Sequence, residues 1–188
     1  MAISINEITS GIGLNIEGNI YSVIEYNHVK PGKGSAFVRV RIKNVKTGAV
    51  LERTFRSSET LDDVPLEERK LQYQYDSGDM LHFMDLENYE QIDLSKDLLG
   101  DSVKFLQENL QVIGLSHNHQ FLKVMLPNFI IFEIKETEPG FRGDTTKSSG
   151  KPAIVDTGAT IQVPLFIEVG DFVKIDTRTG DYVERVKK

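Results

Sequence analysis

Hydrophobic residues along this chain alternate with polar ones far more often than they recur at helical spacing. The clearest case is residues 36–43, where Val38, Val40 and Ile42 alternate with basic residues. This period of two is typical of a strand with one face in a core and the other in water. With further strands expected at 19–26 and 49–56, the first third predicts a small twisted barrel of about five strands.

The rest of the chain continues this pattern. We expect strands in the middle third at 70–75, 80–84, 89–92, 110–115 and 120–126, and in the last third at 129–135, 153–155, 159–163, 171–176 and 182–186. One helix is expected at Asp101–Asn109, behind the cap signal of Asp101 and Ser102. Each of these two thirds, with about five strands, fits an OB-like barrel or another compact β fold.

Two segments are expected to separate the domains. Leu61–Pro65 is acidic and ends in proline, which is typical of a linker. Pro127 and Asn128 interrupt the strand pattern a second time. The sequence therefore predicts three all-β domains, at residues 1–63, 64–127 and 128–188.

A glycine-rich segment, Lys30-Pro31-Gly32-Lys33-Gly34, separates the first two expected strands. Glycine tolerates positive φ and proline lacks a ladder donor, so the chain must turn here. Lys33 is then presented at the tip of a hairpin. Such a lysine either keeps a sheet edge soluble or makes a specific contact. The segment is not a P-loop, because Gly34 follows Lys33 where that motif requires Ser or Thr.

Charge is distributed unevenly along the chain. The net charge is -6, but eight basic residues and one acid, Glu52, lie between Lys30 and Arg56. The outward face of the 36–43 strand is cationic throughout, with Arg39, Arg41 and Lys43. A nucleic-acid partner is therefore compatible with an acidic total.

Several classes of protein and site are disfavoured. The chain has no cysteine, which excludes disulfides, thiolate zinc sites and cysteine nucleophiles. Its first residues show no basic patch followed by an apolar run, and no later stretch approaches the roughly 18 apolar residues of a membrane span, so we expect a cytoplasmic protein without membrane contact. No catalytic triad order, carboxylate pair or cofactor fingerprint emerges, so an enzyme is the weaker class and no cofactor is expected.

Three further features of the sequence resemble functional motifs or sites. His117 and His119 flank an expected turn, but the sequence places no further ligand beside them, so no metal site is expected. Arg142-Gly143-Asp144 matches a cell-adhesion tripeptide, which an unexported chain does not use. The surrounding loop, Glu138–Lys151, is long for so economical a domain and is either functional or a mobile connector.

Taken together, the motifs resemble those of the bacterial elongation factor P family along essentially the whole chain. The matching segments are Val29–Arg39, His82–Met84, Gly100–Leu106, Pro127–Phe129, Pro139–Thr145, Lys151–Ala153, Thr157–Ala159, Val163–Ile167 and Asp176–Tyr182. The resemblance implies an SH3-like (KOW-type) domain followed by two OB-fold domains in an L that imitates a tRNA. It further implies a monomer that binds both ribosomal subunits between the peptidyl and exit tRNA sites and relieves stalling at consecutive prolines.

The resemblance also implies roles for particular residues. Lys33 matches the family's modified hairpin tip, which contacts the CCA end of peptidyl-site tRNA and requires a lysine-modifying enzyme. Lys30, Pro31, Gly32 and Gly34 would support it. Family members carry different modifications, and lysine at this position excludes only the arginine type.

Two other regions receive roles from the same resemblance. The strand cations Arg39, Arg41 and Lys43 would follow the backbone of the tRNA acceptor stem. Residues 143–145, Gly-Asp-Thr, would lie near the exit-site codon on the small subunit. The alternatives are a generic RNA- or single-strand-binding protein of OB type, and the elongation factor P-like paralogue.

Overall fold

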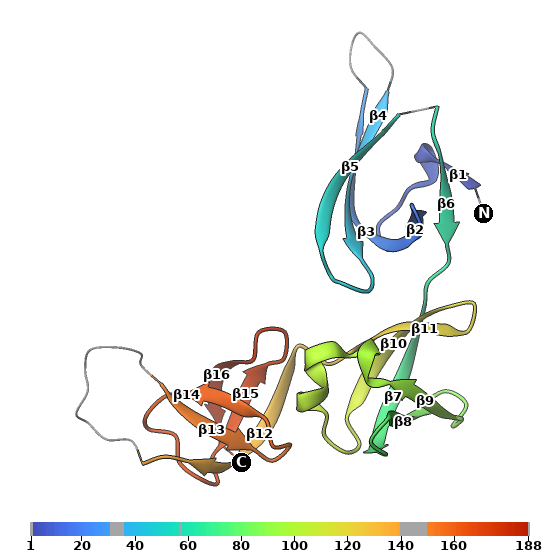
Figure 1. Ribbon diagram of the computed structural model, residues 1–188. Coiled ribbons are helices and arrows are strands. Elements are labelled where there is room, and N and C mark those ends of the chain that lie inside the picture. Colours follow the sequence, from blue (N-terminus) through green and yellow to red (C-terminus); the bar gives the residue numbers. More distant parts are fainter. Residues whose placement is uncertain (1, 31–35, 57, 140–149, 188) are drawn as a thin grey trace. The chain divides into compact units, whose positions relative to one another are not determined.

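The computed structural model describes residues 2–30, 36–56, 58–139 and 150–187. These residues form strands and short 3-10 helices, so the fold is all-β as predicted (Figure 1). The chain divides into two compact units, residues 1–69 with 114–124 and residues 70–113 with 125–188. Within the described ranges, no helix is long and apolar enough to cross a membrane.

The first sheet has six strands in the order β1-β6-β2-β3-β4-β5. Val38, Val40 and Ile42 of β4 are fully buried, as their alternation predicts. The elements are β1 (Ala2–Ser4), η1 (Ile5–Glu7), β2 (Gly13–Ile16), β3 (Asn19–Val29), β4 (Phe37–Asn44), β5 (Val50–Arg56) and β6 (Thr60–Val64).

The interpretation of Leu61–Pro65 as a linker is wrong. Most of this segment belongs to β6, which pairs antiparallel with both β1 and β2. Leu61 and Val64 are buried in the first unit, whereas Asp62 is exposed and Asp63 is partly buried. A Cβ on Gly13 of β2 would overlap the Val64 carbonyl oxygen, so the close approach of β2 to β6 requires glycine there. The domain boundaries at 63/64 and 127/128 stay predictions.

The second sheet has the order β11-β10-β7-β8-β9. Its elements are β7 (Glu67–Asp76), β8 (Met80–Asp85), β9 (Gln91–Ser95), η2 (Lys96–Leu98), η3 (Gly100–Phe105), β10 (Gln111–His117) and β11 (Gln120–Met125). The predicted α-helix at Asp101–Asn109 is instead the 3-10 helix η3, which ends at Phe105. Leu106 is extended and Asn109 has a φ of 64°, so the helix cannot continue.

The third sheet has the order β14-β13-β12-β15-β16. Its strands are β12 (Phe129–Thr137), β13 (Lys151–Val155), β14 (Thr160–Val163), β15 (Phe172–Asp176) and β16 (Asp181–Val186). Phe105 of η3 belongs to its core, with its ring centroid 5.7 Å from that of Phe132. Thr157 Oγ1 also donates to the Lys104 carbonyl at 2.7 Å. The segment predicted as a helix therefore packs, as η3, against the third sheet.

Candidate nucleic-acid interface

The paired strands β3 and β4, called the arm below, lead into the predicted hairpin (Figure 1). Cross-strand pairing runs from Tyr21 with Asn44 to Val29 with Phe37. In contrast, β2 pairs only with the first four residues of β3, and the side chains at 24–28 are exposed. Val38, opposite His28, is nevertheless buried in the core, and β5 pairs with β4 as far as Phe37. The arm therefore lies along the core of the first unit and carries exposed Lys30 at its end.

The tip itself, with the predicted contact residues Pro31, Gly32, Lys33 and Gly34, lies outside the described residues. The pairing of Val29 with Phe37 is the pairing expected for strands on either side of a hairpin. The contact and modification assigned to Lys33 stay predictions.

The outward face of β4 is less cationic than its own sequence suggests, because neighbouring strands supply carboxylates. Arg39 Nε lies 3.3 Å from Glu52 of β5, and the Arg41 guanidinium lies 3.2 Å from Glu25 of β3. All four side chains are more than half exposed. Exposed pairs of this kind contribute about 0–1 kcal/mol, so an RNA phosphate can compete for either arginine.

Lys43, at the other end of β4, lies beside a lysine that sequence reasoning missed. Lys123 of β11 belongs to the same compact unit and lies near Lys43 at the β4–β5 turn. No local signal marked Lys123, because its neighbours in sequence are an ordinary strand.

The second sheet brings together a serine, a histidine and an aspartate that are not ordered as a recognisable motif. His82 Nδ1 lies 2.6 Å from Asp93 Oδ1, and His82 Nε2 lies 2.9 Å from Ser77 Oγ. Ser77 Oγ also lies within hydrogen-bond distance of the Met80 carbonyl, and Tyr75 stacks on the imidazole. Because Ser77 is held within an exposed turn, we interpret the group as a tie between β8, β9 and the β7–β8 turn.

His117 and His119 each have a partner within the protein. His117 lies at the end of β10 and its Nδ1 is 2.8 Å from the Pro65 carbonyl oxygen. His119 Nδ1 is 3.4 Å from the Arg69 guanidinium. The turn is narrower than predicted, since Asn118 and His119 alone form it, both with positive φ. The described ranges contain no group of three His, Cys, Asp or Glu side chains suited to a metal.

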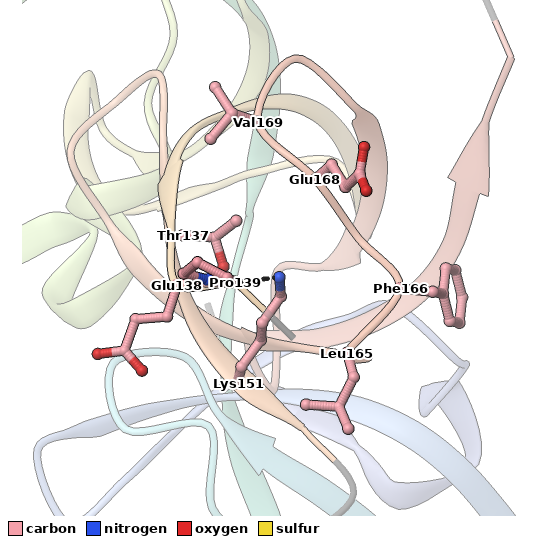
Figure 2. A pocket seen from close by; sticks show the side chains of 8 residues that line it. All are labelled: Thr137, Glu138, Pro139, Lys151, Leu165, Phe166, Glu168 and Val169. Atoms are coloured by element: carbon pink, nitrogen blue, oxygen red, sulfur yellow. Dashed lines mark hydrogen bonds between the residues drawn. The ribbon is translucent and has the colours of Figure 1, made fainter. Parts of the chain in front are cut away.

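In the third sheet, the two ends of the predicted small-subunit loop adjoin a cavity of about 700 Å³ (Figure 2). Buried Lys151 points into it and donates from Nζ to the Glu138 carbonyl at 2.6 Å. Thr137 Oγ1 donates across the same base to the Pro152 carbonyl at 2.9 Å. These bonds fix the two ends of the loop relative to each other. Residues 143–145 of the loop lie outside the described residues.

The β15–β16 turn carries a charged pair beside an exposed aromatic ring. Arg178 donates from Nε to Asp176 Oδ1 at 2.9 Å and from its backbone N at 3.0 Å. These bonds lower the pKa of Asp176 to about 2. Lys174 and Arg178 also lie 5.2 and 6.0 Å from the centroid of Phe129, which is 46% exposed.

Asp176→Asn is expected to remove a pH-dependent part of the stability of the third sheet. The folded pKa lies below the usual value near 3.8, so the carboxylate stabilises the fold above that value and loses this contribution as pH falls toward about 2. Thermal melts of both proteins between pH 5 and pH 2 measure it, as the difference in Tm should shrink over this range. A constant difference would show that the ion pair does not contribute through titration.

Family models match all three parts of the chain. The elongation factor P KOW-like domain matches residues 4–61, its OB domain matches 66–124 and its C-terminal domain matches 130–185. The predicted KOW-type and OB fold class is therefore confirmed.

Curated relatives extend the match to nearly the full length. The elongation factor P of Moorella thermoacetica is 49% identical over 97% of this chain and 99% of its own. The elongation factor P of Acetivibrio thermocellus is 48% identical over 98% of this chain and 100% of its own. The elongation factor P of Caldicellulosiruptor saccharolyticus is 52% identical over 94% of this chain and 95% of its own.

Among solved structures, the fold is similar to a translation initiation factor 5A from Methanococcus jannaschii. It has a TM-score of 0.50 at 24% identity, over 67% of this chain and 92% of that one. A translation initiation factor 5A family protein from Naegleria fowleri has a TM-score of 0.53 at 18% identity, over 67% of this chain and 98% of that one. With matched family models and near full-length relatives, the chain belongs to the elongation factor P family of translation factors.

Proposed function

We propose that this factor binds the ribosome between the peptidyl and exit tRNA sites and promotes peptide-bond formation at consecutive prolines. The observation that carries the proposal is the β3–β4 arm, whose paired strands lead into the Lys-Pro-Gly-Lys-Gly sequence and end at exposed Lys30. An arm of this kind suits the delivery of one lysine to a distant, crowded site. Family membership supplies the translational context.

The factor would act by positioning the peptidyl-tRNA rather than by acid–base chemistry. Proline is a poor nucleophile, and a rigid nascent chain draws peptidyl-tRNA out of reactive geometry. Correct orientation of reactants contributes up to about 7–11 kcal/mol in well-ordered systems. Lys33 would hold the CCA end through its phosphates and sugars, while the glycines on either side let the backbone approach closely. The ribosome remains the catalyst.

The other predicted contacts divide the task of binding. Arg39, Arg41 and Lys43 would contact the acceptor-stem backbone without reading its sequence. The loop around Asp144 would contact the small subunit. An enzyme that modifies Lys33 is the remaining partner, and a monomeric, L-shaped, tRNA-like arrangement stays a prediction.

Reconstituted translation of a Pro-Pro-Pro message tests the proposal. Adding the protein, purified from its native host, should restore full-length product from that message and leave a matched message without prolines unchanged. Failure to relieve stalling by correctly modified protein would remove this function.

Arg39→Glu and Lys43→Glu are each expected to weaken ribosome association in a salt-dependent way. Each substitution replaces one phosphate attraction with one repulsion, and salt screens both. Affinity measured across a salt series should show the largest losses at low salt. Glu52→Gln is the matched control, because it releases Arg39 without reversing a charge and should bind at least as well as the parent. Equal losses at all salt concentrations would contradict a phosphate contact.

One observation favours the second candidate, a binder of single-stranded RNA. Exposed Phe129 with Lys174 and Arg178 beside it offers a stacking ring together with cations. Binding of a fluorescent single-stranded oligonucleotide without ribosomes would support this candidate, provided that Phe129→Ala abolishes it.

A further inference from the structure

Two lysines from distant parts of the chain lie at one turn of the first unit. A Cβ built on Gly48 would lie 3.9 Å from Lys123 Nζ and 3.9 Å from Lys43 Cε. Lys43 ends the basic face of β4, and Lys123 lies on β11. Both belong to the compact unit of residues 1–69 with 114–124.

The turn beneath these lysines is held by several hydrogen bonds. Asn44 Oδ1 accepts from the backbone N–H groups of Lys46 and Thr47 at 3.0 and 2.9 Å. The Asn44 backbone N–H donates to the Ala49 carbonyl at 2.8 Å, and the Asn44 carbonyl accepts from the Gly48 backbone N–H at 2.9 Å. Gly48 has a φ of +76°, which suits glycine and keeps this corner free of a side chain. The turn is thus a defined platform.

Charge distinguishes this pair from the arginines farther along β4. Arg39 and Arg41 each have a glutamate partner. In the part of the chain that the structure describes, neither Lys43 nor Lys123 has a carboxylate partner. Along the basic face of β4, the positive charge that no carboxylate of the described residues offsets therefore lies at the turn beside Gly48, where Lys43 and Lys123 are close together.

The surroundings of Lys123 disfavour its positive charge when no anion is nearby. Burial, and then the neighbouring charge of Lys43, lower the pKa of the Lys123 ammonium. A bound anion between the two groups would offset both effects. Ammonium groups act as point charges with rotatable donors, so two of them can share the oxygens of one phosphate.

We propose that Lys43 and Lys123 together bind one backbone phosphate of a structured RNA, with the Asn44–Ala49 turn as their platform. This inference rests on the proposed function, because it adds a defined contact to the acceptor-stem interface. It assigns a role to Lys123, which lies outside the segment matched by the KOW-like model. The phosphate would join a residue of that segment to a residue of the OB-matched segment.

Lys43→Gln, Lys123→Gln and the double variant test the shared contact on ribosomes carrying peptidyl-site tRNA. Losing one phosphate contact should lower the slope of log affinity against log salt by up to about 0.9. Because the lysines share one phosphate, the double variant should lose no more than about 0.9 in total, whatever each single variant loses. A loss in the double of about twice 0.9 would indicate two separate phosphates, and no loss in any variant would indicate no contact; either overturns the proposal.

Two variants guard against trivial explanations. Lys135→Gln removes a lysine of the third sheet that is paired with Glu133, and should leave the slope unchanged. Lys123→Arg keeps the charge and should retain most of the slope. If Lys123→Arg behaves like Lys123→Gln while folding normally, charge is not the reason and the proposal fails.

A second measurement separates this inference from the proposed function. In the full chain with isotope-labelled lysine side chains, addition of a short RNA duplex should shift the Lys43 and Lys123 signals and raise the pKa of Lys123. The Lys135 signal should not move. Shifts at Lys43 and Lys123 without relief of Pro-Pro-Pro stalling would retain the site and reject the function. Relief of stalling without those shifts, or with unchanged salt slopes, would retain the function and reject the site.

Discussion

Lys33→Ala is expected to abolish most relief of Pro-Pro-Pro stalling while leaving most of the ribosome affinity in place. In the proposed function the tip would provide one contact among several, whereas the basic face of β4 and the loop of the third sheet would supply the others. Misplacing reacting groups by about 1 Å can cost about 100-fold in rate. We therefore expect a loss of about this size in the rate of Pro-Pro bond formation by bound factor.

Single-turnover peptide formation at saturating factor measures this rate, and a parallel titration measures affinity. Lys135→Ala is the matched control, because Lys135 is a lysine of the third sheet paired with Glu133, outside the predicted contacts, and should retain the rate. If Lys33→Ala lowered affinity as much as rate, and bound factor kept its activity, the tip would be a binding residue rather than a positioning one.

Intact mass of the protein from its native host should accompany this experiment. A mass above that of the bare chain, allowing for loss of Met1, that is absent from Lys33→Ala would place the modification at Lys33. A mass equal to the bare chain would mean that positioning is done by unmodified lysine.

The alternation of apolar and polar residues is enough to predict a strand that has one face in the core. Val38, Val40 and Ile42 alternate because β4 has one face in the core, and their burial follows directly. The segment Leu61–Pro65 was misinterpreted because two adjacent acids dominate its composition. Its strand character comes from pairing with β1 and β2, which lie far away in sequence. Long-range pairing of this kind leaves no local signal.

The helix prediction failed for a related reason. The spacing of Val103 and Leu106 is helical, but the packing of Phe105 into the core of the third sheet ends η3 early. Tertiary packing here outweighs local propensity.

The candidate site shows the same division. The sequence marked the basic face of β4 because its residues alternate on one strand. It could not show that Glu52 and Glu25 pair with Arg39 and Arg41, since each glutamate lies on a neighbouring strand. Lys123 was missed because only the folded chain brings it to the β4–β5 turn.

Replacing Gly143, Asp144 and Thr145 together with alanine is expected to abolish relief of stalling at limiting concentration of factor. A Gly-Asp-Thr sequence, with the polar side chains of Asp and Thr, suits hydrogen bonding to RNA backbone or a base edge. Losing two hydrogen bonds worth about 1 kcal/mol each corresponds to about a thirtyfold loss of affinity. Relief should therefore return in part when the variant is supplied in excess.

The fold should survive this triple substitution, because the bonds that hold the ends of the loop do not involve the replaced residues. Lys151 Nζ bonds the Glu138 carbonyl, and Thr137 Oγ1 bonds the Pro152 carbonyl. Unchanged thermal melting and an unchanged intact mass would confirm that folding and modification are intact. Alanines at Ser148 and Ser149 are the matched control, since they change the same loop outside the predicted contact. Should the triple variant relieve stalling as well as the parent at limiting concentration, the loop would be only a connector between β12 and β13.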